Sequence, residues 1–339
     1  MNENFINYQN NMEENINRGV IIVEPNANDY ICGASPLPIV IINPLGDNRP
    51  YKPDAENQSG KGADKMDCVT VSSSGSIETI FRILHKNGLM PQGCIDYLKK
   101  WNFYNANGDV QISTRWASIQ NGTTNKGNSA NAVAQWWRDN GFIPEWMLPN
   151  DQTLEWNPYY DTACLTDQMK QCAKEGLDFF DINYEWITNE DYKTPLQRGA
   201  IQILTAVCPG WSTIIPIPAC SLSVCHATEL LNVEPDVKKD IWDSYTPNAK
   251  TFASDYPVPY KMLYLLTTKT MDTNQFLKDN DLKWVRNTDN GSFGRMLQGE
   301  LKIFVTTDRA TLALLDDKVR TNGVQITNDV WSKLPQTNF

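Results

Sequence analysis

Hydrophobic positions in the first half of the chain repeat with a helical period. One stripe, spaced three or four residues apart, consists of Ile77, Ile80, Phe81 and Leu84. It predicts a helix over 68–87, because residues at that spacing share one helix face. Similar stripes predict two further helices at 128–140 and 162–175, and a glycine directly follows each of them as a stop signal.

From residue 199 onward the pattern changes to short apolar runs separated by Pro, Gly, Asn and Asp. We predict strands at 200–207, 211–217, 224–233, 239–243 and 259–266. Helices first and antiparallel strands second are typical of an α+β domain. We therefore expect an α+β fold with an N-terminal helical half, a C-terminal antiparallel β half and a cleft between them.

The segment before this domain has a different pattern. Residues 1–18 form a polar tail, and residues 19–53 join two β-branched runs with closely spaced prolines. Proline excludes helix and central strand, so we expect an extended arm at 19–53. Exposed Ile and Val runs favour aggregation, so something must cover them. The arm either packs on its own domain, docks onto a partner subunit, or lies across the active-site cleft as a propeptide does.

The C-terminal segment is predicted to form a further small unit. Three short strands are expected there, at 282–286, 294–298 and 301–305. A helix capped by Asp308 follows them. These elements predict a small α/β appendage at 268–339, after a central domain at 54–267 and a tail and arm at 1–53.

Composition and charge exclude several classes of function. The chain has 339 residues, of which 41% are hydrophobic and 11 are Trp, enough for a large core. Its formal net charge of −10 repels phosphate backbones, so we expect no nucleic-acid partner. No apolar run reaches the roughly 18–20 residues of a membrane span, so we expect no membrane partner.

The N-terminal residues and the number of cysteines indicate the kind of cellular compartment in which the protein is expected. Residues 1–18 contain no apolar segment, so we expect no secretory signal peptide. The 8 cysteines are then expected to be thiols in a reducing compartment. Cys220, Cys225 and His226 do not have the spacing of a common zinc site, so we expect no metal and no other cofactor.

The candidate chemistry depends on a scarce residue type. The chain has 2 histidines, His85 and His226, and histidine is the usual general acid–base group near neutral pH. His226 alone lies where a cysteine, a histidine and a carboxylate follow one another in catalytic order. We therefore take Cys68, His226 and Asp243 as the candidate catalytic residues.

These residues have complementary roles in the expected site. Cys68 begins the helix at 68–87, where unpaired N–H groups and the helix dipole stabilise a thiolate. His226 would pair with the thiolate and later protonate the leaving amine, and Asp243 would orient the imidazole. The backbone N–H of Cys68 and the side-chain amide of Gln58 are the expected oxyanion donors.

Each candidate also has a purely structural interpretation. Cys68 fits a buried core thiol, His226 a hydrogen-bonded strand histidine, Asp243 a turn residue and Gln58 an ordinary loop residue. Asp67 directly precedes Cys68 and would raise the pKa of the thiol if its carboxylate pointed inward.

The order of these motifs resembles the papain-like cysteine peptidase superfamily. The resemblance rests on Gln58, Cys68, His226-Ala227 and Asp243-Ser244-Tyr245, and it covers about residues 54–267. It implies a papain-like fold in which the nucleophilic cysteine begins the central helix and the histidine lies on a strand of the β half. Two features depart from the family pattern. Val69 replaces the Trp that usually follows the nucleophile, and Gln58 lies farther upstream than usual.

Two hypotheses follow, from different classes of function. The first is a papain-like cysteine peptidase or amidase with a peptide or protein substrate, encoded by a phage, since the whole chain also resembles papain-like phage proteins. The alternative is a structural or assembly protein of a virion, which keeps the scaffold with weakened or no activity and contacts other virion subunits through residues 19–53. In both cases we expect the host cytoplasm or the virion as its location. A peptidoglycan amidase of a related Cys-His fold is a third, minor alternative.

Overall fold

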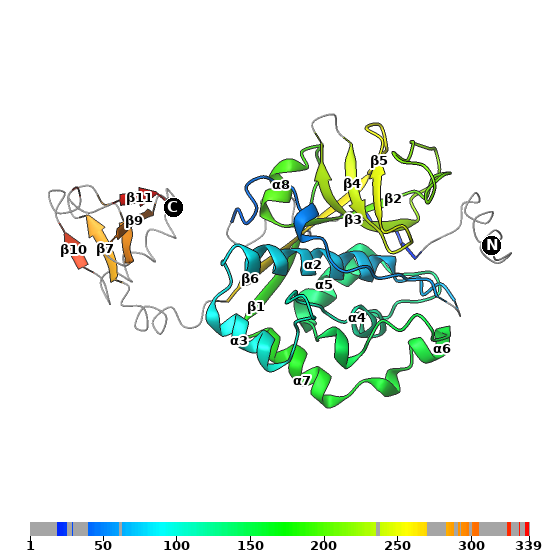
Figure 1. The fold of residues 1–339 in the computed structure, drawn as a ribbon, viewed down its shortest axis with the longest axis horizontal. Coiled ribbons are helices and arrows are strands. Elements are labelled where there is room, and N and C mark those ends of the chain that lie inside the picture. Colours follow the sequence, from blue (N-terminus) through cyan, green and yellow to red (C-terminus); the bar gives the residue numbers. More distant parts are fainter. Residues whose placement is uncertain are drawn as a thin grey trace. The chain divides into compact units, whose positions relative to one another are not determined.

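The chain forms two compact units, Met1–Lys269 and Thr270–Phe339. A computed structural model describes residues 19–25, 29, 40–60, 63–234, 238–269, 283–287, 291, 293–297, 300–304, 324–326, 332 and 336–338. Figure 1 shows the fold, with the helices and strands labelled as in the text.

The first unit begins with a helical half. Its helices are α2 (Cys68–Lys86), α3 (Gln92–Lys100), α4 (Thr114–Gln120), α5 (Ala130–Asn140), α6 (Trp156–Tyr159), α7 (Asp167–Gly176) and α8 (Lys193–Arg198), with short 3-10 turns at Arg49–Tyr51, Glu145–Met147 and Thr162–Cys164. Side-chain oxygens of Ser113, Ser129 and Thr166 each accept a backbone N–H at the start of α4, α5 and α7. These caps explain why the three helices begin where they do.

The second half of this unit is a six-stranded sheet. Its strands are β1 (Phe180–Trp186), β2 (Ala200–Thr205), β3 (His226–Val233), β4 (Lys239–Trp242), β5 (Ala249–Phe252) and β6 (Tyr260–Thr268), in the order β1-β6-β2-β3-β4-β5. Every neighbouring pair is antiparallel. The sheet therefore places the start of β3 and the end of β4 beside each other.

Helix α2 is the central element of the unit. It runs between the sheet and the remaining helices, in contact with β2, β3 and β6 on one side and with α4 and α5 on the other (Figure 1). Its residues 68–84 are all buried. The ring of Phe81 packs edge-on against Phe142 and Phe180, with centroids 5.2 Å apart in both pairs. Such burial from all sides fixes the position of the helix start, where Cys68 lies.

The structure confirms the predicted α+β fold. The predicted helices at 68–87 and 128–140 correspond to α2 and α5, and four predicted strands correspond to β2, β3, β4 and β6. The helix predicted at 162–175 is divided into a 3-10 turn and α7. β1 and β5 were not predicted.

The prediction of a strand at 211–217 is wrong. This segment forms turns, in which Ile214 donates its N–H to the Gly210 carbonyl at 2.8 Å, and Gly210 has φ 82. A left-handed glycine reverses the chain before a strand can form. Ile217 alone pairs with the sheet, through a bridge to Phe252.

The described parts of the N-terminal arm lie on the first unit. Val20 pairs with Asn128 in a parallel bridge, and Ile42 donates its N–H to the Gln197 carbonyl at 2.9 Å. Val20 and Ile42 are buried, whereas Val40 is 46% exposed. The described residues of the arm therefore pack on their own domain, which is one of the three alternatives for the arm. Residues 26–28 and 30–39 lie outside the described part of the chain.

The second unit contains a five-stranded sheet. Its strands are β7 (Lys283–Asn287), β8 (Phe293–Leu297), β9 (Glu300–Phe304), β10 (Val324–Ile326) and β11 (Gln336–Asn338), in the order β10-β7-β8-β9-β11. The first three correspond to the three strands predicted there. The helix predicted from Asp308 lies outside the described residues.

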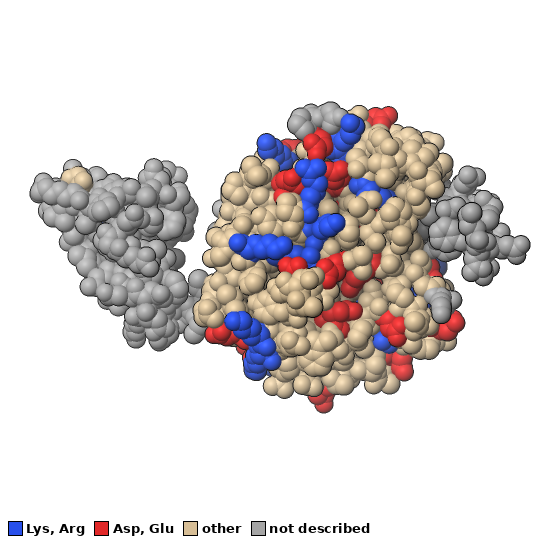
Figure 2. All heavy atoms as spheres, viewed as in Figure 1, with Lys and Arg blue, Asp and Glu red and all other residues tan. Residues whose placement is uncertain are grey.

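Two features of the described residues concern membranes and charged partners: the character of the helices and the distribution of surface charge. In the described part of the chain, no helix has the length and apolar character that crossing a bilayer requires. On the face shown in Figure 2, a row of basic side chains runs down the middle of the first unit, with acidic side chains beside and below it.

Candidate active site

The antiparallel sheet brings His226 and Asp243 together. His226 is the first residue of β3, and Asp243 directly follows β4, which pairs with β3. The Nε2 atom of His226 lies 2.6 Å from Oδ1 of Asp243, and both side chains are fully buried. Two of the three predicted catalytic residues are therefore in direct contact.

The second oxygen of Asp243 has two further partners. Nζ of Lys250 lies 2.6 Å from Oδ2, and Nε1 of Trp211 donates to the same oxygen at 2.7 Å. Burial alone would raise the pKa of Asp243, but His226 and Lys250 outweigh it and hold the pKa below its ordinary value. Asp243 is thus a charged, firmly held partner for the imidazole.

The other nitrogen of the imidazole is unpaired. Nδ1 of His226 is buried and has no hydrogen-bond partner in the described part of the chain. Two aromatic rings enclose the imidazole, with Tyr245 at a centroid distance of 4.9 Å and Trp211 at 5.6 Å. The ring is therefore fixed in place with one nitrogen left for a further partner.

Cys68 lies beside this strand. It is the first residue of α2, and the backbone N–H of Ala227, the neighbour of His226, donates toward its thiol. The Cys68 side chain is fully buried. Burial, with the negative charges of Asp64 and Asp67, raises the pKa of the Cys68 thiol well above its ordinary value. The thiol thus lies beside the backbone next to His226, and no hydrogen bond joins it to the imidazole among the described residues.

Gln58 ties the loop before Cys68 to the segment after Asp243. Its amide Nε2 donates to Oδ1 of Asp64 at 2.8 Å and to the Tyr245 hydroxyl at 2.6 Å. Its Oε1 accepts the Ser244 hydroxyl at 2.7 Å. Gln58, the predicted oxyanion donor, is therefore buried, and its amide group donates to two protein acceptors, Asp64 and Tyr245.

The N-terminal arm passes close to the loop that precedes Cys68. Ile21 donates its N–H to the Asn128 carbonyl at 2.8 Å, and Asn128 donates its N–H to the Gly19 carbonyl at 3.0 Å. A side chain at Gly19 would collide with the carbonyl of Met66, two residues before Cys68. We call residues 19–25 the strap, because its first residues pair with Asn128 and Gly19 lies against Met66 in the loop before α2.

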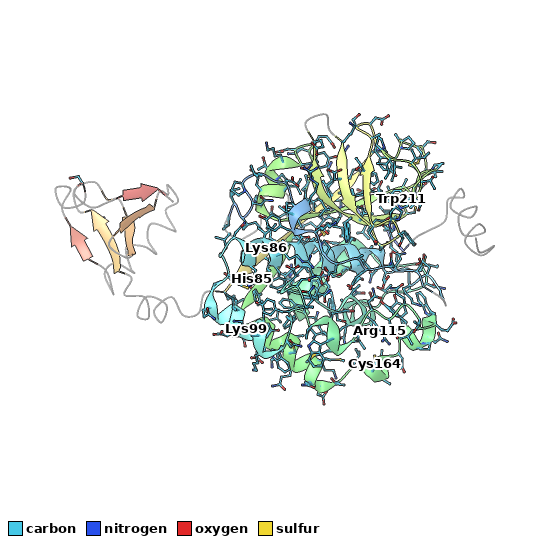
Figure 3. The ribbon with its side chains drawn as sticks, viewed as in Figure 1. His85, Lys86, Lys99, Arg115, Cys164 and Trp211 are labelled. Carbon is cyan, nitrogen blue, oxygen red and sulfur yellow. A yellow bond between two sulfur atoms is a disulfide. The ribbon has the colours of Figure 1, made fainter. Side chains whose placement is uncertain are left out.

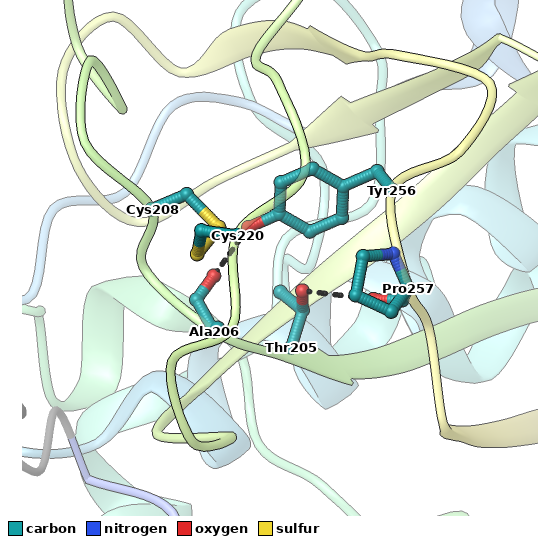
Figure 4. Close-up of a disulfide and its surroundings, with 6 residues drawn as sticks. All are labelled: Thr205, Ala206, Cys208, Cys220, Tyr256 and Pro257. Atoms are coloured by element: carbon teal, nitrogen blue, oxygen red, sulfur yellow. Dashed lines mark hydrogen bonds between the residues drawn. A yellow bond between two sulfur atoms is a disulfide. The ribbon is translucent and has the colours of Figure 1, made fainter.

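A disulfide joins Cys208 to Cys220, with the two Cα atoms 5.6 Å apart (Figure 4). The expectation that all cysteines are thiols is therefore wrong for this pair, because the turn after β2 folds the two residues onto each other. Trp211, whose position is labelled in Figure 3, lies inside the loop that this bond closes. The Tyr256 hydroxyl donates to the Ala206 carbonyl at 2.5 Å and fastens the base of the loop.

The other described cysteines are not gathered at one place. Five of them are outside any disulfide: Cys68, Cys94, Cys164, Cys172 and Cys225. Within the described ranges, no group of three or more His, Cys, Asp or Glu side chains is placed to hold a metal ion. Cys220, part of the weak zinc pattern in the sequence, is taken up by the disulfide.

Sequence reasoning missed two residues that hold Asp243. Lys250 lies on β5, a strand that was not predicted, and Trp211 begins the segment for which a strand was predicted at 211–217. The periodicity of the chain offers no signal for Lys250. For Trp211, only the fold shows that its indole reaches the carboxylate.

Comparison with known proteins finds similar solved structures. Comparison with protein-family models and with curated proteins finds no match. Among solved structures, xylellain, a cysteine protease from Xylella fastidiosa, is similar with a TM-score of 0.50 at 14% identity, over 76% of this chain and 98% of that chain.

Two further solved structures are similar. The bromelain protease from Ananas comosus gives a TM-score of 0.45 at 13% identity, over 65% of this chain and 97% of that chain. Procathepsin L 3 of Tenebrio molitor gives 0.46 at 11% identity, over 78% of each chain. At these identities the likeness concerns the fold, and the predicted papain-like fold is confirmed by the xylellain match.

Proposed function

We propose that this chain is a cysteine peptidase or amidase that hydrolyses peptide-type bonds through Cys68, His226 and Asp243. The observation that carries the proposal is the state of the His226 ring. Nε2 is held by a charged carboxylate, while Nδ1 is buried without a hydrogen-bond partner among the described residues. A histidine that served the fold alone would have both nitrogens satisfied, because an unpaired buried polar atom is costly.

The proposed reaction uses Cys68 as nucleophile and His226 as acid and base. The thiol proton passes to Nδ1, and the sulfur attacks the carbonyl carbon of the substrate. The backbone N–H of Cys68 stabilises the oxyanion that forms. His226 then returns the proton to the leaving nitrogen, so the amine departs and a thioester remains.

Water completes the cycle. His226 takes a proton from water, which attacks the thioester and releases the acid, and the proton returns to the sulfur. Asp243 acts through the imidazole, which it keeps oriented with Nε2–H toward its own oxygen. Lys250 and Trp211 keep Asp243 ionised and in place.

The strap supports an extended peptide as the substrate. Asn128 offers both its N–H and its C=O to the backbone of residues 19–21, which is how a protein edge binds an extended chain. Met66, beside the strap, is adjacent to Asp67 at the start of α2. We therefore propose that the strap occupies part of the substrate site and that the described structure is a closed state.

Hydrolysis of a pool of fluorogenic peptides tests the proposal. Cys68→Ala and His226→Ala are each expected to lower kcat/KM about a thousandfold or more, since nucleophile and base act as a unit. Cys164→Ser, a change to a free thiol that the proposed site does not use, is the matched control and should retain activity. Hydrolysis that persists in Cys68→Ala would exclude this thiol as the nucleophile.

A second candidate function is an assembly protein of a phage virion, acting in the host cytoplasm or in the particle. The exposed apolar side chains Ile21, Val40 and Ile41, which are 42%, 46% and 46% exposed, favour it. Sedimentation of the full chain with Val40→Asp and Ile41→Asp tests it. If the unaltered chain sediments as a monomer and the two variants sediment in the same way, the exposed side chains give no support to an assembly role.

A further inference from the structure

A buried carboxyl group directly precedes the proposed nucleophile. Asp67 is 1% exposed and occupies the position before the first residue of α2, where its side chain makes no helix-capping hydrogen bond. Oδ2 accepts the Tyr159 hydroxyl at 2.9 Å and the Ser118 hydroxyl at 3.2 Å. Oδ1 is buried and has no hydrogen-bond partner in the described part of the chain.

No described cation forms an ion pair with this carboxyl group, although two cations lie near it. Lys65, two residues earlier, directs its Nζ at the Leu154 carbonyl and lies 5.2 Å from the centre of the Tyr159 ring. Arg115 on α4 donates to the carbonyls of Tyr159 and Pro158. Both cations therefore donate to backbone oxygens and not to Asp67, which acts on Lys65 through its charge without a hydrogen bond.

The remaining titratable groups around Asp67 are acidic. Asp64 and Glu56 come from the preceding loop, Tyr159 and Tyr160 from the segment at and after α6, and Cys68 from α2 itself. Burial, then the charge of Asp64, raises the pKa of Asp67 to about 7, against the hydrogen bonds from Tyr159 and Ser118. The carboxyl group therefore changes charge within the neutral pH range.

Asp67 and Cys68 share one helix end. The N-terminus of α2 stabilises a single negative charge by its unpaired N–H groups and its dipole. A carboxylate at the preceding residue repels a thiolate in the same dry environment, where screening by water is weak. When the carboxyl group holds its proton, that repulsion disappears.

We propose that Asp67 is a positioning residue whose proton state sets how readily Cys68 forms a thiolate. The inference rests on the proposed function, because it concerns the reactivity of the same sulfur. It predicts that the thiolate fraction of Cys68 rises less with pH than it would beside a neutral residue, because Asp67 becomes charged as the pH passes through the neutral range.

The test is the rate at which iodoacetamide alkylates Cys68 in the full chain between acidic and alkaline pH, read by mass mapping of the Cys68 peptide. Asp67→Asn keeps the shape and removes the charge. The ratio of its rate to that of the unaltered chain should be near one at pH about 5. It should rise to about threefold to tenfold above pH 8, because a like charge shifts a pKa by about one unit or more and a less basic thiolate is slightly less nucleophilic.

Tyr159→Phe provides a second variant that keeps the carboxyl group. It removes a hydrogen bond that favours the ionised form, so Asp67 should hold its proton to a higher pH. Alkylation of Cys68 should then exceed that of the unaltered chain around neutral pH and converge with it at the acidic end. Ser118→Ala should act in the same direction and more weakly, because its hydrogen bond is longer.

The outcomes separate this inference from the proposed function. If Cys68 is alkylated and the Asp67→Asn ratio is the same at every pH, Asp67 has only a structural role and the inference is overturned. A Tyr159→Phe profile that coincides with that of the unaltered chain contradicts it as well. If no variant is alkylated at Cys68 at any pH, the proposed nucleophile itself fails, and the inference fails with it.

Discussion

The two halves of the site hold buried carboxyl groups in opposite ways. On the sheet side, Asp243 is 2% exposed and faces Lys250, His226 and the indole of Trp211. On the helix side, Asp67 is 1% exposed and faces two hydroxyl groups. The pKa of Asp243 is lowered, whereas that of Asp67 is raised to about 7.

The difference shows that burial alone does not decide the charge of a carboxyl group. Burial favours the neutral form of both residues, and a cation at hydrogen-bond distance reverses this for Asp243 alone. The carboxyl group on the sheet side is therefore charged. The pKa of the carboxyl group on the helix side lies near neutrality, and this residue directly precedes Cys68.

The largest expected effect comes from removing the cation of the sheet side. Lys250→Met leaves the charge of Asp243 with one partner fewer inside the protein. We expect the free energy of unfolding to fall by about 3–5 kcal/mol, measured by urea denaturation at neutral pH. Lys170→Met, which removes an exposed ion pair with Asp167, is the control and should cost less than about 1 kcal/mol. Equal losses in the two variants would show that Lys250 does not hold the carboxylate.

The next effect concerns the loop that supplies Trp211. Replacing Cys208 and Cys220 with Ser removes a cross-link over 12 residues and should lower the free energy of unfolding by about 2–4 kcal/mol. Because Trp211 lies in this loop, kcat/KM for peptides should fall as well. Cys172→Ser, at a buried free thiol outside the loop, separates the loss of the cross-link from the change of residue type. A double variant as stable and as active as the unaltered chain would leave the disulfide without a structural role.

The smallest expected effect is a pH dependence of stability from Glu229 on β3. Both of its carboxylate oxygens are buried without hydrogen-bond partners among the described residues, and burial raises its pKa to about 8. The unfolded chain loses this proton first, near its ordinary pKa, so stability falls as the pH rises through that value toward 8. Glu229→Gln should reduce the loss between pH 5 and pH 8 by on the order of 2 kcal/mol, measured by urea denaturation at each pH. An unchanged pH dependence would mean that Glu229 ionises without cost.

The sequence singled out candidate site residues, but it predicted only part of the sheet. Cys68, His226 and Asp243 were chosen because the chain has 2 histidines and because helix and strand signals surround the three residues, and their catalytic role stays a prediction. β1 was missed although apolar and polar residues alternate along it from Phe180 to Trp186, which is the period of a strand. β5 spans only four residues, too few for a pattern.

The tertiary partners were beyond the reach of sequence reasoning. Trp211 and Lys250 meet at Asp243 only because the disulfide loop and β5 lie beside the end of β4 in the folded chain. From the sequence, we could say only that Asp67 would raise the pKa of Cys68 if its carboxylate pointed inward. Its hydrogen bonds to Tyr159 and Ser118 depend on packing between distant segments, which no local pattern encodes.

The proposed function requires Cys68 to be a reactive thiol although it is buried. Competitive labelling of all cysteines outside the disulfide with a peptide-based electrophile, followed by mass mapping, measures this in the unaltered chain and in His226→Ala. We expect Cys68 to be modified before the more exposed Cys164, and we expect this preference to disappear in His226→Ala. Labelling at Cys164 with Cys68 unmodified in the unaltered chain would rule out Cys68 as the nucleophile.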